Sequence, residues 1–149
     1  MTTITVVNVK TAKPGSFVYC GRYNSTYSLQ SSPLANPFKL TREGCRQTLL
    51  VLYRSWLYAH RNDKAIAAEI SRLASLLERG DVAIGCWCAP KACHCDVIAD
   101  FVRRECARRQ AVAAMQREPT VAPSKRRVSG IDAEQTDAEL GPMFQMGKE

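Results

Sequence analysis

Residues 82–98 read Val-Ala-Ile-Gly-Cys-Trp-Cys-Ala-Pro-Lys-Ala-Cys-His-Cys-Asp-Val-Ile, and this stretch decides the fold. Its first five residues are a short, mostly apolar run, which is typical of a buried strand. After a tight loop, Asp96 begins a pattern of apolar residues at helical spacing that runs to about Arg117. The cysteines of this stretch therefore lie where a strand ends and a helix begins. Ligands bind at such junctions in open α/β sheets, so the stretch predicts both the fold class and the place of a site.

Strand-like and helix-like patterns alternate on the amino-terminal side of this stretch. β-Branched and aromatic residues predict strands over 3–9 and 17–20. Helical spacing predicts one helix from Thr41, as its N-cap, to about His60, and a second from Asp63 to Gly80. The apolar stripe of the first of these helices consists of Leu49, Leu52, Tyr53, Trp56 and Leu57. We therefore predict a small Rossmann-like α/β domain of two or three layers, with a short, mostly parallel sheet and about three helices.

The composition is that of one globular domain. The chain has 149 residues, of which 46% are hydrophobic and 23% are charged. Residues 118–149 lack apolar periodicity and contain Pro, Ser, Gly and acidic residues, so we expect a single domain over 1–117 followed by a disordered tail. No apolar run approaches the roughly 18–20 residues that cross a bilayer, and the amino terminus lacks a secretory pattern. These features predict a cytoplasmic protein without membrane contact.

Charge is distributed unevenly along the chain. The net charge is +7 overall, +6 over residues 102–127 and −4 over residues 128–149. The main basic residues of the first of these segments are Arg103, Arg104, Arg108, Arg109 and Lys125-Arg126-Arg127. Such a segment can follow a phosphate backbone, and it predicts nonspecific, salt-sensitive contact with nucleic acid. The alternative is an ordinary solvated helix face.

Four of the seven cysteines are crowded between Cys86 and Cys95, and the residues leave three interpretations open. The first is a metal site, with zinc as the candidate ion. Its ligands would be Cys86, Cys88, Cys93 and either His94 or Cys95. These residue types suit zinc, although the spacing lacks the paired Cys-x₂-Cys knuckles of common structural zinc sites.

The second interpretation is a reactive thiol, Cys93 or Cys88, that works with His94 in nucleophilic or redox chemistry. The third is structural. Strand geometry turns Cys86 and Cys88 to the same face, and free cysteine is commonly buried, so these two would be small buried apolar residues. Cys93, His94 and Asp96 would then form a helix start that holds an anion or a loop. In each case Asp96 can either cap the following helix or hold the His94 ring.

Four motifs, in this order, resemble those of a known family. They are Tyr19-x-Gly21-Arg22, Ser32-Pro33-Leu34-x-Asn36-Pro37-Phe38, Cys86-Trp87-Cys88-Ala89-Pro90 and Cys93-His94-x-Asp96. The family, of phages and bacteria, is catalogued only as a domain of unknown function (number 4326), and the resemblance covers residues 3–101. It implies a compact α/β domain of a phage-type genome, located in the host cytoplasm if phage-encoded, without an established activity. The chain differs from the family at Cys20 and Cys95, where a larger aliphatic residue and a small or variable residue are usual.

The motifs predict a pocket at one edge of the sheet. If their strands are parallel neighbours, Gly21 and Arg22 lie at the same edge as the cysteine loop, where an arginine suits a phosphate or carboxylate. Asn36 and Cys88 would complete a site for an anionic small molecule, such as a nucleotide, at the helix N-terminus. Phe38, after Pro37, is expected to anchor this loop in the core.

The candidate catalytic residues of this pocket are Cys93, His94 and Asp96. The hypothesis is a protein that binds, and can process, a nucleotide-like anion. The alternative is a noncatalytic interaction module, stabilised by zinc, that contacts nucleic acid or a host protein through its basic helix and tail.

Overall fold

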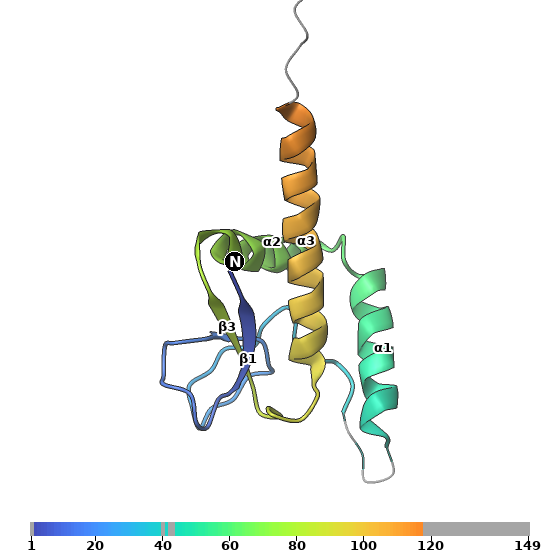
Figure 1. Ribbon diagram of the computed structural model, residues 1–149. Helices are drawn as coiled ribbons and strands as arrows, with labels where there is room; N and C mark the ends of the chain where they lie inside the picture. The colour runs from blue at the N-terminus through green and yellow to red at the C-terminus, as the bar shows by residue number, and fades with distance from the viewer. Residues whose placement is uncertain (1, 40, 42–43, 118–149) are drawn as a thin grey trace, which may run out of the picture. The chain divides into compact units, whose positions relative to one another are not determined.

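The computed structural model describes residues 2–39, 41 and 44–117, and the predicted tail lies outside these residues. Three parallel strands form its sheet: β1 (Ile4–Asn8), β2 (Val18–Tyr19) and β3 (Val82–Cys86). Their order is β1-β3-β2, so the last strand in sequence is the middle one in space. Figure 1 shows β1 and β3 side by side. The predicted short parallel sheet is confirmed.

Three helices cover the described part of the chain: α1 (Arg46–Ala59), α2 (Lys64–Arg79) and α3 (His94–Gln116). Both α1 and α2 pack on α3, and α2 and α3 also contact β3 (Figure 1). The predicted α/β class with about three helices is therefore confirmed. No helix in these described ranges is long and apolar enough to cross a membrane.

Three details of the predicted helices are wrong. The first helix begins at Arg46, with Cys45 as its N-cap, rather than after Thr41. The carbonyl of Thr41 instead accepts a hydrogen bond from the Gly44 N–H, so Thr41 lies ahead of the helix and does not cap it. In the same helix Leu52 is 47% exposed, because only a narrow stripe around Tyr53 and Leu57 faces the core. The third helix starts at His94, two residues earlier than predicted.

The core brings the long loop after β2 against the helices. Tyr53 is fully buried, and its hydroxyl donates a hydrogen bond of 2.7 Å to the carbonyl of Leu34, which is also fully buried. Phe38 packs against the same cluster, as predicted for the loop anchor. The remaining fully buried aliphatic residues are Leu57, Leu73, Ile84, Ile98 and Val102. The loop is thus fixed to the core at two points, and one wall of the candidate site is fixed with it.

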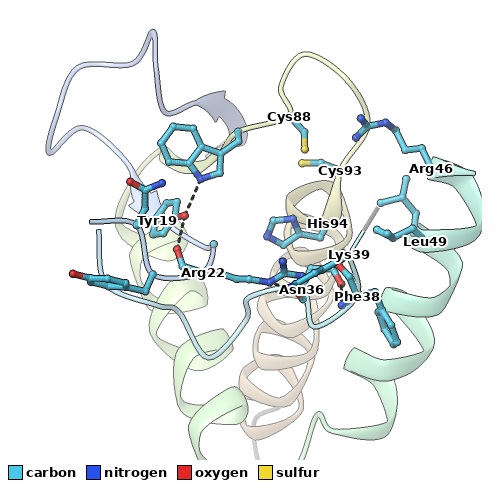
Figure 2. Close-up of a pocket in the computed structure, with 15 residues that line it drawn as sticks. Tyr19, Arg22, Asn36, Phe38, Lys39, Arg46, Leu49, Cys88, Cys93 and His94 are labelled. Atoms are coloured by element: carbon cyan, nitrogen blue, oxygen red, sulfur yellow. Dashed lines mark hydrogen bonds between the residues drawn. The ribbon is translucent and has the colours of Figure 1, made fainter. Parts of the chain in front are cut away.

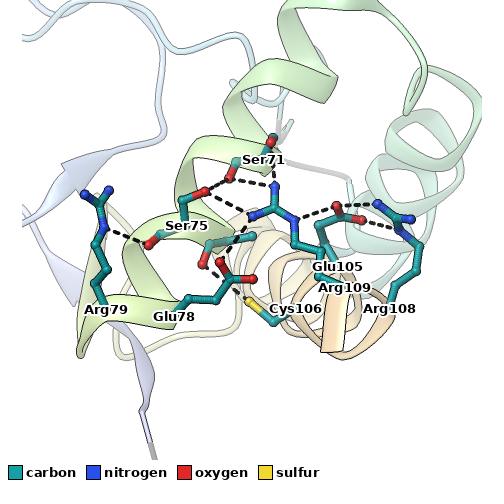
Figure 3. A network of polar contacts seen from close by, with 9 residues as sticks. Ser71, Ser75, Glu78, Arg79, Glu105, Cys106, Arg108 and Arg109 are labelled. Carbon is teal, nitrogen blue, oxygen red and sulfur yellow. Dashed lines mark hydrogen bonds and ion pairs between the residues drawn. The ribbon is translucent and has the colours of Figure 1, made fainter. Parts of the chain in front are cut away.

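Arginines of the basic helix form ion pairs within the fold (Figure 3). Arg109 reaches across to α2, where it donates to the Ser71 carbonyl, the Ser75 hydroxyl and the Glu78 carboxylate. Within α3, Glu105 accepts from both Arg109 and Arg108. Arg103 is likewise paired with Asp100. These pairs leave less free positive charge than the sequence suggested. Nucleic-acid contact stays a prediction, and residues 125–127 lie outside the described residues.

Candidate functional site

A cavity of about 520 Å³ opens at the carboxyl end of β3 (Figure 2). Because β2 and β3 are parallel and directly paired, Gly21 and Arg22 lie at the same edge as the cysteine loop. The cavity is lined by Tyr19, Gly21, Arg22, Tyr23, Asn24, Asn36, Phe38, Lys39, Arg46, Leu49, Leu50, Trp87, Cys88, Cys93 and His94. Of the predicted site residues, the structure therefore brings together Arg22, Asn36, Cys88, Cys93 and His94, together with Gly21.

The charge of the cavity wall has one sign. Three cationic side chains, Arg22, Lys39 and Arg46, line it, and no aspartate or glutamate among the described residues does. Arg46 comes from the first turn of α1 and donates a hydrogen bond of 3.1 Å to the carbonyl of Ala92 in the cysteine loop. Cations that line a concave surface of low polarity attract anions more strongly than the same cations on a flat surface.

Aromatic side chains, including Tyr19 and Trp87, also line the cavity. Trp87 donates from its indole N–H to the Tyr19 hydroxyl at 2.9 Å, and that hydroxyl donates to the carbonyl of Arg22 at 2.7 Å. The ring of Tyr27 packs edge-on against Trp87 with centroids 5.0 Å apart. These contacts hold large flat rings in fixed positions, as a planar ligand requires.

Arg22 holds the loop rather than presenting its fork to the cavity. Its Nε and Nη2 donate to the carbonyl of Asn36 at 2.9 and 2.6 Å, and Nη2 also donates to the carbonyl of Phe38 at 2.7 Å. The side-chain oxygen of Asn36 accepts from the Phe38 N–H. Two of the three guanidinium nitrogens thus have backbone partners, so the bidentate anion clamp expected of Arg22 would require these contacts to break.

Replacing Arg22 with lysine should lower the free energy of unfolding by about 1–2 kcal/mol, although the charge is kept. A lysine amine cannot reproduce the planar fork that bonds two carbonyls at once. Urea denaturation followed by circular dichroism measures the change. Lys10→Arg, at an exposed position, is the control and should leave stability unchanged. If Arg22→Lys instead retained full stability and lost only ligand affinity, the residue would be an anion clamp.

Three buried cysteines meet beside the cavity. The sulfurs of Cys86, Cys93 and Cys95 all lie within 4.8 Å of one another, and those of Cys86 and Cys93 are 3.1 Å apart. Cys86 ends β3, Cys93 is the N-cap of α3, and Cys95 is in its first turn. This buried triad can hold a metal ion.

The triad differs from the zinc ligand set expected from the sequence. Strand β3 ends at Cys86, so Cys88 lies in the loop beyond it and does not share a strand face with Cys86, contrary to the expectation. The Cys88 N–H instead points to the Cys86 sulfur at 3.4 Å. Neither Cys88 nor His94 joins the three convergent sulfurs, and Cys95 takes their place.

Of the three thiols, Cys86 is the one whose surroundings favour the thiolate. A hydrogen bond from the Cys93 thiol, followed by one from Cys95, lowers the pKa of Cys86, and the backbone N–H of Cys88 contributes. The same contact raises the pKa of Cys93, which serves as the donor. Its position at the α3 N-terminus adds the positive end of a helix dipole to the cluster.

His94 is a neutral imidazole with a defined tautomer. Its Nε2 lies 2.8 Å from the carbonyl oxygen of Cys20, which can only accept, so Nε2 carries the proton and Nδ1 is left as an acceptor. Burial lowers the pKa of His94, and the Tyr53 ring packs edge-on against it at 5.4 Å. A neutral His94 at the cavity wall can accept a proton at pH 7.

Asp96 closes the helix start. Its carboxylate accepts a hydrogen bond of 2.7 Å from the backbone N–H of Cys93, which completes a capping box at α3. Of the two roles expected from the sequence, capping is the one seen. Asp96 does not line the cavity, so its predicted catalytic role has no support from its position.

Sequence reasoning missed several residues of the site. Lys39 and Arg46 belong to no motif in the sequence that could have indicated a site. They reach the cavity only because the loop after β2 packs against α1. Tyr19 and Trp87 stand inside the quoted motifs, so their motif positions were the available signal. Cys95, which the sequence offered only as an alternative to His94 in the ligand set, is one of the three convergent sulfurs.

Comparison with known proteins supplies a family without a function. A family model described as Domain of unknown function (DUF4326) matches residues 7–104, about two thirds of the chain. The match includes every residue that lines the cavity and all three cysteines of the triad. No curated protein and no solved structure matches the chain.

Proposed function

The chain belongs to the family described as Domain of unknown function (DUF4326), and we propose that it binds a nucleotide-like anion in the cavity at the end of β3. The observation that carries this proposal is the lining of the cavity. It combines three cations with large aromatic rings, and none of the described residues that line it is acidic. Phosphate and carboxylate groups suit the cations, and the flat ring of a base suits the aromatic wall.

Two groups at the cavity wall support a chemical step on the bound molecule. Cys93 offers a thiol beside the positive end of α3, and His94 offers an unprotonated Nδ1 that can accept a proton. Addition of the thiol to an electrophilic carbon of a double bond in the ligand would form a carbon–sulfur bond and break the π bond, whose electron pair takes up a proton relayed by His94. The thiol proton would pass to the imidazole. Binding is the primary proposal, and this step is its extension.

The proposal is tested by isothermal titration of the reduced protein with a panel of nucleoside phosphates and phosphorylated metabolites. Lys39→Ala and Arg46→Ala should each weaken binding of the tightest ligand about tenfold, the loss of one charge-assisted contact. Lys10→Ala removes the same charge from an exposed position outside the cavity lining and should leave affinity unchanged.

Two results would overturn the proposal. The first is the absence of heat from every ligand in the panel. The second is equal weakening by Lys10→Ala, since that outcome would reduce the effect to net charge. A thermal melt of each variant separates lost binding from lost folding.

The cysteine triad favours a second candidate, a noncatalytic interaction module stabilised by zinc. Buried convergent sulfurs can hold zinc, and the remaining cations of α3 could approach a phosphate backbone. Against this, a tetrahedral zinc ion requires a fourth ligand, and His94 already uses Nε2 as a donor to the Cys20 carbonyl. A domain of this size also needs no metal to fold.

A further inference from the structure

We infer that Cys86, Cys93 and Cys95 form a three-sulfur site for one thiophilic metal ion, with monovalent copper as the ion that fits it. The inference does not depend on anion binding in the neighbouring cavity, but it shares Cys93 with the chemical step proposed there, and a metal-bound Cys93 could not act as the nucleophile. It rests on which sulfurs converge, on what surrounds them, and on which neighbouring groups stay out of reach.

The three sulfurs come from two rigid elements that meet at one point. Cys86 is the last residue of the central strand, while Cys93 and Cys95 open α3. A metal about 2.3 Å from each of three sulfurs in a plane sets them roughly 4 Å apart. The sulfurs lie within 4.8 Å of one another, and the Cys86–Cys93 pair at 3.1 Å has to open by only about 1 Å.

The site consists of sulfur alone. All three cysteines are buried, and the cluster contains no carboxylate. Thiolates prefer soft ions, whereas magnesium and calcium require oxygen ligands. The chemistry of the donors therefore restricts the occupant to a thiophilic ion.

The nearest candidates for a fourth ligand lie outside the three convergent sulfurs. Cys20, which is buried against Cys95, directs its thiol to the carbonyl of Val18 at 3.7 Å. His94 Nε2 lies 3.8 Å from the Cys95 sulfur, but it donates its proton to the carbonyl of Cys20 and so has no lone pair to give. Cys88 is outside the convergent group. Zinc in a structural site takes four ligands in a tetrahedron. Monovalent copper is satisfied by two or three thiolate ligands, so it matches the three sulfurs that converge here.

The surroundings stabilise the negative charge that the bound sulfurs would carry. Each thiol that binds as a thiolate releases its proton to the solvent as the metal enters. The Cys88 N–H approaches the Cys86 sulfur, and the first turn of α3 directs its positive dipole end toward Cys93 and Cys95. These groups offset part of the charge of a copper–thiolate centre.

The test is anaerobic titration of the reduced, full-length protein with Cu⁺ in the presence of a competing Cu⁺ chelator. One equivalent should bind, and Zn²⁺ should compete poorly for it. X-ray absorption of the loaded wild-type protein should show three sulfur neighbours and no nitrogen. This measurement needs no variant, so it holds even if a substituted chain fails to fold.

Variants then assign the ligands. Cys95→Ser should weaken Cu⁺ binding at least tenfold, whereas Cys88→Ser and Cys45→Ser should leave it unchanged. Lys39→Ala should bind Cu⁺ normally, which separates this site from the anion-binding cavity. No stoichiometric Cu⁺ uptake, a nitrogen neighbour in the absorption spectrum, tighter binding of Zn²⁺ than of Cu⁺, or equal loss in Cys88→Ser would each overturn the inference.

Discussion

Tyr53→Ala is expected to lower the free energy of unfolding by about 3–5 kcal/mol, the range for removing a large aromatic side chain from a core. Tyr53 is fully buried, stacks with Trp56 and packs edge-on against His94. Its loss would leave a cavity between α1, α3 and the loop after β2. Because small domains are stable by only about 5–15 kcal/mol, the variant should melt at a much lower temperature. Denaturant unfolding followed by circular dichroism gives the value.

Tyr53→Phe separates the hydroxyl from the ring. It should cost about 1–3 kcal/mol, because the carbonyl of buried Leu34 loses its 2.7 Å hydrogen bond from the Tyr53 hydroxyl. Tyr58→Ala is the matched control in the same helix. Tyr58 is exposed and contacts Arg61 through its ring, so its removal should cost less than about 1 kcal/mol. Equal losses for Tyr53→Ala and Tyr58→Ala would contradict the packing described for α1.

Arg109→Met should lower the free energy of unfolding by about 2–3 kcal/mol. The Arg109 guanidinium joins α3 to the Ser71 carbonyl and to the Ser75 hydroxyl, and its side chain is only 24% exposed. Methionine keeps the length and packing of the side chain but leaves these partly buried acceptors without their charged donor. Guanidinium chloride would screen the ion pairs, so urea is the appropriate denaturant.

Arg108→Met provides a comparison with the same change of charge one residue earlier. Arg108 is 65% exposed and pairs with Glu105 within the same helix, so its removal should cost less than about 1 kcal/mol. If the two variants were equally stable, the contacts of Arg109 across to α2 would contribute nothing. If Arg109→Met kept its stability and lost affinity for DNA at low salt, the basic helix would be a nucleic-acid surface instead.

The sequence predicted those elements whose signals are local. The apolar run Val82–Cys86 and the regular spacing of Ile66, Leu73 and Leu77 in α2 correctly placed a strand and a helix. The start of α1 could not be placed from the sequence, because Thr41 has the residue type of an N-cap. In the structure the Thr41 carbonyl accepts from the Gly44 N–H, and Cys45 is the N-cap. The predicted apolar stripe of α1 was also too wide, because the spacing of apolar residues does not show how much of the helix surface its neighbours cover.

The candidate site was predictable in outline only. The sequence argument placed Arg22 beside the cysteine loop on the condition that β2 and β3 are parallel neighbours, and the structure shows that pairing. The partners of each side chain depended on contacts between distant segments. The carbonyl of Cys20 that fixes the His94 tautomer is 74 residues away in the chain. Which cysteine joins Cys86 and Cys93 depends on where β3 ends. The strand ends at Cys86, one residue before Trp87, and the third sulfur is that of Cys95 rather than Cys88.

The strand order has a consequence for how the chain matures during synthesis. Both β1 and β2 pair with β3 and not with each other, and β3 lies 78 residues after β1 in the paired register. While the ribosome is still producing the helices between them, the first two strands have no partner to bind. Such distant pairing is slow to form, because a long loop must close before any contact rewards it. The nascent protein should therefore expose two unpaired strands until β3, which lies just past the middle of the chain, emerges.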